Sequence, residues 1–176
     1  MVVMEAENYT GIAAGTGSAS GINWVFTGSQ PGFSGIGAMQ AVPNNGVSCD
    51  TGTQGPRLDF NVYFQTAGTY YIWVRMLGPT GTDDSVNVGL DGAVTATKIT
   101  DESAAWHWEE MSYTTAGRAT MTVGSEGGHM VNVWMREDGV YVDKVVLTTN
   151  ANYTPAGLGP DESPREPAND YGSTYP

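Results

Sequence analysis

The chain has 176 residues, 24 of them glycine, with 15% charged side chains and a formal net charge of −12 at pH 7. This length is enough for one domain with its own core. The excess of acidic residues argues against nucleic acid and anionic membrane surfaces as partners, because like charges repel. A single cysteine, Cys49, excludes an intrachain disulfide, and no stretch is apolar enough to span a membrane.

Short apolar stretches separated by turn residues recur along most of the chain. In residues 57–65, Leu58, Phe60, Val62 and Phe64 alternate with polar side chains, which predicts a strand with one buried face. In chain order, the further predicted strands are residues 2–8, 23–27, 37–42, 69–77, 85–90, 93–99, 106–114, 118–124, 130–135 and 141–148. With turn signals about every 8 to 12 residues and no amphipathic helix, this pattern indicates an antiparallel sandwich or barrel.

The last part of the chain differs in composition. Residues 155–176 contain five of the nine prolines, with acidic residues and serines between them. We therefore expect one domain over residues 1–158, followed over residues 159–176 by a Pro-rich acidic linker or a tail lying on the domain. We interpret the chain as one domain of a larger secreted protein, expected to be extracellular and monomeric.

Three acidic residues stand out near the two ends of the domain. Glu5 and Glu7 would share one face of a strand, and Asp143 lies within an apolar strand where an unpaired charge is costly. One solution places all three around a hard cation such as calcium. The alternative is a solvent-facing glutamate pair and a surface pair between Asp143 and Lys144.

Other candidate functional residues are aromatic or charged. Trp106, at the start of the predicted strand of residues 106–114, would be a platform for a sugar ring if it is still an exposed loop residue and a core residue if it is not. Glu137 and Asp138 lie in a loop tip that is either a solvated turn or a set of sugar hydroxyl partners. Arg75 and Asp84 could pair with each other or line a site at the loop ends.

Patterns for catalysis are weak. Neither His107 nor His129 has metal-ligand spacing, and no nucleophile elbow or phosphate-binding glycine loop is present. Acidic residues are plentiful, so a carboxylate pair for glycoside hydrolysis stays open. We expect no enzyme activity and assign no catalytic residue.

Several motifs, in this order, resemble carbohydrate-binding modules of families 6 and 35 and related jelly-roll modules. The resemblance covers roughly residues 3–150. It is carried by Glu5-Ala6-Glu7, Gly32-Phe33-Ser34-Gly35, the segment from Ala67 to Arg75, Trp106-His107-Trp108, and Val142-Asp143-Lys144-Val145 within the run Val133–Asp143.

This resemblance implies a β-jelly roll of two antiparallel sheets with a structural Ca²⁺ held by Glu5, Glu7 and Asp143. It also implies that Trp106 is the sugar-stacking aromatic. The loop of residues 43–56 lacks the second aromatic that family 6 modules commonly have, and Trp24 is a candidate substitute.

Three functions fit the sequence. The first is a non-catalytic module that brings a covalently attached enzyme to a polysaccharide or oligosaccharide, with ligand-binding candidates Trp106, Asp138, Glu137, Arg75, Asp84 and Trp24. The second is a structural or adhesive spacer of a large extracellular protein. The third is a small glycosidase or lyase on the same fold, because a fold does not determine function.

Overall fold

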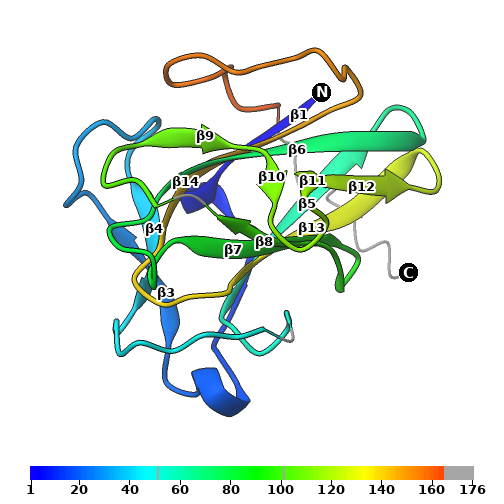
Figure 1. The fold of residues 1–176 in the computed structure, drawn as a ribbon. Helices are drawn as coiled ribbons and strands as arrows, with labels where there is room; N and C mark the ends of the chain where they lie inside the picture. The colour runs from blue at the N-terminus through cyan, green and yellow to red at the C-terminus, as the bar shows by residue number, and fades with distance from the viewer. Residues whose placement is uncertain (51, 101, 165–176) are drawn as a thin grey trace, which may run out of the picture.

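The computed structural model describes residues 1–50, 52–100 and 102–164 of the chain. They form two antiparallel seven-stranded sheets that pack face to face (Figure 1). The predicted all-β sandwich is thereby confirmed. No helix in these residues has the length and apolar character needed to cross a membrane.

The first sheet, sheet A, is built around a central strand near the end of the chain. Its order is β12 (Thr120–Val123), β6 (Gly68–Leu77), β14 (Tyr141–Thr148), β4 (Ala38–Val42) and β3 (Asn23–Thr27), with β1 (Val2–Glu5) paired to β14 and β9 (His107–Glu109) paired to β6.

The second sheet, sheet B, has a longer linear order. It runs β11 (Gly117–Arg118), β10 (Met111–Ser112), β8 (Ala93–Thr100), β7 (Ser85–Leu90), β13 (Gly127–Met135), β5 (Arg57–Phe64) and β2 (Gly11–Ala13). Two short 3₁₀ turns, η1 (Ala6–Asn8) and η2 (Gly17–Ala19), flank β2.

The core lies between the two sheets and follows the predicted alternation. Leu58, Phe60 and Phe64 of β5 are buried opposite Ile72 and Val74 of β6. Burying each such side chain contributes about 1.5–3 kcal/mol. The period-two pattern therefore placed the core faces of the central strands correctly.

Several predicted strands differ from the observed ones in their bounds, and two examples show why. The first strand stops at Glu5, where the chain turns into η1. The predicted strand of residues 106–114 is two strands, because β9 pairs with β6 of sheet A while β10 pairs with β8 of sheet B. A change of sheet within one apolar stretch leaves no mark on the local alternation.

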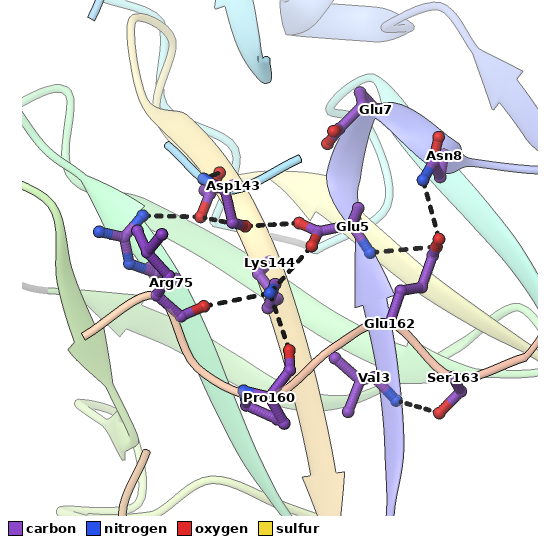
Figure 2. A network of polar contacts seen from close by, with 12 residues as sticks. Val3, Glu5, Glu7, Asn8, Arg75, Asp143, Lys144, Pro160, Glu162 and Ser163 are labelled. Carbon is purple, nitrogen blue, oxygen red and sulfur yellow. Dashed lines mark hydrogen bonds and ion pairs between the residues drawn. The ribbon is translucent and has the colours of Figure 1, made fainter. Parts of the chain in front are cut away.

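The C-terminal segment lies along β1 as far as it is described. The N–H of Val3 donates to the hydroxyl of Ser163, and the carbonyl of Val3 accepts the N–H of Ser163. The ammonium group of Lys144 donates to the carbonyls of Leu158 and Pro160 (Figure 2). Residues 159–164 thus lie on the domain, and the rest of the expected tail lies outside the described residues.

Candidate functional site

Two of the three acids singled out in the sequence, Glu5 and Asp143, meet at one serine, and the third, Glu7, lies beside the next residue, Gly35. The hydroxyl of Ser34 donates to Glu5 Oε2 at 2.6 Å and lies 3.1 Å from Asp143 Oδ2. The N–H of Ser34 also donates to Asp143 Oδ1 at 2.9 Å. The glycine-rich loop between β3 and β4 therefore ties the end of β1 to the middle of β14.

Two of these acids are neutralised by cations of the chain itself. Arg75 on β6 pairs with Asp143 at 2.7 Å, and Lys144 on β14 pairs with Glu5 at 2.9 Å (Figure 2). All four side chains are buried. A buried charge without a partner is strongly unfavourable, so each pair removes a cost that its acid would otherwise impose.

Glu7 is the third acid and has no such cation among residues 1–50, 52–100 and 102–164. Its Oε1 accepts the N–H of Ile36 at 3.0 Å, and its Oε2 is buried without a hydrogen-bond partner. Burial raises the pKa of Glu7, and the nearby Glu5 and Asp143 raise it further. Within the part of the chain that the structure describes, these three carboxylates thus face two cations, and one carboxylate oxygen has no hydrogen-bond partner.

The chemistry of this cluster suits a hard cation in part. Carboxylate oxygens are the ligands that calcium prefers, and the unpartnered Oε2 of Glu7 is available to one. Among residues 1–50, 52–100 and 102–164, however, no group of three or more His, Cys, Asp or Glu side chains is placed as a ready metal cluster.

Trp106 lies beside this cluster and is half-buried. Its indole N–H donates to the carbonyl of Gln30 at 3.2 Å, and its ring meets Tyr141 edge-on at 6.3 Å. The guanidinium of Arg75 lies 5.5 Å from the ring centroid. A side chain at Gly32 would come within 3.2 Å of the ring, so the indole packs closely on the loop backbone. Only part of this tryptophan is open to a ligand.

A pocket of about 360 Å³ opens where the loops of residues 78–84 and 102–106 meet the ends of β7 and β8. The N–H of Gly78 donates to the carbonyl of Ser103, which joins these two loops. The pocket is lined by Gly81, Asp84, Lys98, Thr100, Glu102, Tyr113 and Glu137. Two of the predicted ligand-binding acids, Asp84 and Glu137, thus meet here.

The two acids share a hydrogen bond in the wall of the pocket, and each residue is more than nine-tenths buried. Asp84 Oδ1 accepts the hydroxyl of Thr100 at 2.7 Å, and Glu137 accepts from Ser85 at 2.5 Å and from Arg136. Burial, and then the bond to Glu137, raises the pKa of Asp84 to about 6. The pKa of Glu137 is lowered, although its burial opposes this, by hydrogen bonds from Asp84 and Ser85 and by the charge of Arg136.

Tyr113 gives the pocket an exposed aromatic wall. Its side chain is 69% exposed, and the ammonium of Lys98 lies 4.2 Å from its ring centroid. Sequence reasoning missed both residues, because Tyr113 follows the predicted strand pattern and nothing local shows that β10 ends beside β8. Its one sequence signal is an aromatic residue directly before the Thr-Thr-Ala-Gly turn.

Three predicted ligand residues make contacts inside the domain. Trp24 is buried in the core with its indole N–H bonded to the carbonyl of Pro56, so it cannot stack on a sugar. Asp138 is fully buried and accepts backbone N–H groups of residues 45–47. Arg75 pairs with Asp143 and not with Asp84, because the register of β6 against β14 brings them together.

A larger groove of about 1140 Å³ lies on the other side of the molecule, where β1 faces β5. Its lining includes the exposed Tyr63 and the His129–Asp91 pair. Both ring nitrogens of His129 are bonded, to Asp91 and to the carbonyl of Ser125. The groove contains none of the predicted site residues.

The two packed sheets form a β-sandwich with the fold of carbohydrate-binding modules. The chain superposes on a family 35 carbohydrate-binding module from Clostridium thermocellum with a TM-score of 0.56 and 15% identity, over 82% of this chain and 95% of that one. It also superposes on a family 36 module in complex with calcium and xylotriose, with a TM-score of 0.51 and 16% identity, over 84% and 100% of the two chains. At these identities the likeness establishes the fold, and it confirms the predicted resemblance to carbohydrate-binding modules.

Sequence comparison identifies the family. Residues 1–162 match the glycosyl hydrolase family 115 C-terminal domain, and the chain belongs to this family. A curated relative, the uncharacterized protein P23 of Formosa agariphila, is 34% identical over an alignment of 114 residues that covers 59% of this chain and 28% of the relative. The matched region thus spans less than a third of the relative's length.

Proposed function

We propose that this domain binds a glycan through the pocket between Tyr113 and the Asp84–Glu137 pair, and that it has no catalytic role. The observation that supports this most is the combination of an exposed aromatic ring with buried carboxylates in one pocket. A sugar needs both an apolar surface for its ring face and fixed acceptors for its hydroxyls. Trp106, on the adjoining loop, would extend this surface with its exposed part.

The family to which the chain belongs supports a role beside an enzyme. It is named for the C-terminal domain of glycosyl hydrolases, so a covalently attached catalytic domain is the expected neighbour. In that setting the domain would hold its enzyme near a polysaccharide outside the cell. The acidic charge favours a neutral glycan, because an anionic one would be repelled.

The direct test is isothermal titration against a panel of neutral oligosaccharides that includes xylotriose, the ligand of the family 36 module. We expect micromolar to millimolar binding, a loss of at least about tenfold in Tyr113→Ala, and a smaller loss in Trp106→Ala, since stacking on one aromatic contributes about 1 kcal/mol or more. Tyr63→Ala is the matched control, because Tyr63 is also exposed but lies in the other groove. Equal losses in Tyr113→Ala and Tyr63→Ala would exclude this pocket.

The proposal also separates this domain from a small glycosidase. Glycosidases hold their two carboxyl groups about 5 Å or more apart so that a sugar or a water fits between them. Asp84 and Glu137 are instead hydrogen-bonded to each other. We expect no release of reducing sugar by the purified domain. Release that disappears in Glu137→Gln would overturn the non-catalytic assignment.

A structural Ca²⁺ at Glu5, Glu7 and Asp143 is the second part of the proposal. It is supported by the excess carboxylate charge and by the unpartnered Oε2 of Glu7. Bound calcium would neutralise the excess charge and so stabilise the folded state through ligand linkage. We expect calcium to raise the melting temperature over that in EDTA, magnesium to act less, and Glu7→Gln to abolish the difference. An unchanged melting temperature in all these conditions would show that Arg75 and Lys144 suffice.

The alternative of a structural or adhesive spacer makes the opposite prediction for the pocket. A spacer would bind no glycan on the panel, and Tyr113→Ala would then be silent in every binding assay.

A further inference from the structure

Strand β8 carries a bulge beside the pocket. Its residues Thr97 and Lys98 together oppose the single residue Asn87 of β7. Both Ala96 and Ile99 face the core although three positions separate them, whereas strict alternation would bring Lys98 to the core with Ala96. The extra residue therefore turns Lys98 out of the core and into the pocket lining.

Two local costs accompany this bulge. Lys98 has a φ of 50°, a left-handed conformation that is unfavourable for a residue with a side chain. The side chain of Asn87 is buried, and its Oδ1 accepts the N–H of Lys98 at 2.8 Å, but its Nδ2 has no hydrogen-bond partner among the described residues. A buried amide with an unpaired donor destabilises the folded state. Because strained residues cluster at ligand-binding sites, the bulge calls for a functional reason.

The bulge also fixes the position of the Tyr113 wall. The carbonyl of Lys98 accepts the N–H of Tyr113 at 2.9 Å, and the carbonyl of Thr97 accepts the hydroxyl of Ser112 at 2.7 Å. These bonds join β10 and the turn after it to β8, the neighbouring strand of sheet B (Figure 1). The ammonium of Lys98 comes to lie 4.2 Å from the centroid of the Tyr113 ring. The bulge thus places a cation and an aromatic ring together in the pocket.

A sugar in this pocket needs a hydrogen-bond donor as well as acceptors. Sugar hydroxyls both donate and accept, whereas the carboxylates of Glu102 and Glu137 in the pocket lining only accept. The ammonium of Lys98 has three N–H donors on a flexible stem. Its contact with the Tyr113 ring is weaker than a hydrogen bond from an ammonium to a ligand oxygen, so a sugar can displace it from the ring.

We propose that Lys98 is a glycan-binding residue and that Asn87 is its positioning residue. In the free protein the ammonium lies over the Tyr113 ring. When a sugar stacks on that ring, the ammonium moves to a hydroxyl of the sugar, while other hydroxyls donate to the carboxylates. This inference rests on the proposed glycan pocket and adds to it the residue that supplies the donors.

The test is isothermal titration of the full chain with the panel of neutral oligosaccharides that includes xylotriose. Lys98→Met keeps most of the stem and removes the donors, so we expect the affinity to fall about five- to tenfold. Lys98→Arg keeps a cation with N–H donors and should recover most of this loss. The matched control is Thr95→Met, at an exposed position of the same strand outside the pocket lining, which should keep the wild-type affinity.

A second pair of variants identifies the positioning residue. Lys98→Gly adopts the left-handed conformation without help, so it should lose affinity as Lys98→Met does while its melting temperature stays the same or rises. Asn87→Ala removes the acceptor for the N–H of Lys98 and should weaken binding in the wild type. In the Lys98→Gly background it should add little to the loss. Equal losses in the two backgrounds would show that Asn87 does not act through Lys98.

The outcomes separate this inference from the pocket itself. If Tyr113→Ala loses affinity while Lys98→Met keeps or gains it, the pocket stands and the binding role of Lys98 is refuted. An equal loss in Thr95→Met would refute that role as well. If no panel member binds, or if Tyr113→Ala and Lys98→Met are both silent, the pocket and the role of Lys98 are refuted together.

Discussion

Replacing Arg75 by methionine tests whether the chain neutralises its own buried acids. Arg75 and Asp143 are both buried and lie 2.7 Å apart. Methionine keeps most of the volume of the side chain but leaves Asp143 with only the N–H and hydroxyl of Ser34 as donors. Removing one partner of a buried ion pair costs about 3–5 kcal/mol. At about 2–4 °C per kcal/mol for a domain of this size, the melting temperature should fall by about 10 °C.

The assay is urea unfolding followed by tryptophan fluorescence, in EDTA so that no metal compensates for the lost charge. The double variant Arg75→Met/Asp143→Asn is the matched control, because it removes both charges and keeps an acceptor for Ser34. It should recover at least half of the lost stability. A loss below about 1 kcal/mol in Arg75→Met, or a double variant no more stable than the single one, would refute the reasoning.

Three further predictions concern titration and packing. The hydrogen bond to Asp91 raises the pKa of His129 above 6.5, so the stabilisation from this pair is complete below pH 6.5 and is lost as pH rises through the raised pKa. Because Asp91 is largely exposed, we expect the free energy of unfolding, measured by urea titration, to change by less than about 1 kcal/mol. The change should be absent in His129→Gln. The pKa of Asp84 in the folded protein is raised to about 6, so stability should be lost as pH rises from about 4 to 6, the opposite of a carboxylate paired with a cation. The loss is at most about 3 kcal/mol. Unfolding curves measured across that pH range should show the decline in the wild type and not in Asp84→Asn. Phe64→Ala removes a fully buried ring from the core and should cost about 3–5 kcal/mol by urea unfolding, whereas a loss under 1 kcal/mol would mean that the core refills the cavity.

The sequence was most informative where local geometry decides the outcome. Alternation in β5 placed Leu58 and Phe64 in the core, because successive side chains of any strand point to opposite faces. An Asp-Gly pair between two strands is typical of a tight hairpin turn, and Asp91-Gly92 joins β7 to β8 with both residues at positive φ. These features depend on neighbours a few residues apart.

Local patterns failed where the outcome depends on which elements meet. Trp24 lies between two glycine-rich stretches and was a candidate sugar-binding aromatic, yet it packs between the sheets and its indole N–H donates to the carbonyl of Pro56. Tyr113 looked like a strand residue and is the most exposed aromatic of the candidate pocket. The exposure of a side chain depends on which distant segments pack against it, and the alternation of apolar and polar residues within one strand does not specify those segments.

The acidic cluster shows both contributions at one place. The sequence by itself identified Glu5, Glu7 and Asp143 as acids that need compensation, because a charge in an apolar strand is costly whatever surrounds it. The tertiary structure decided that Arg75, 68 positions before Asp143, and Lys144 supply the compensation for two of them, and that no cation among the described residues pairs with Glu7. That choice follows from the pairing of β14 with β6 and β1, a long-range order that the alternation within each strand does not contain.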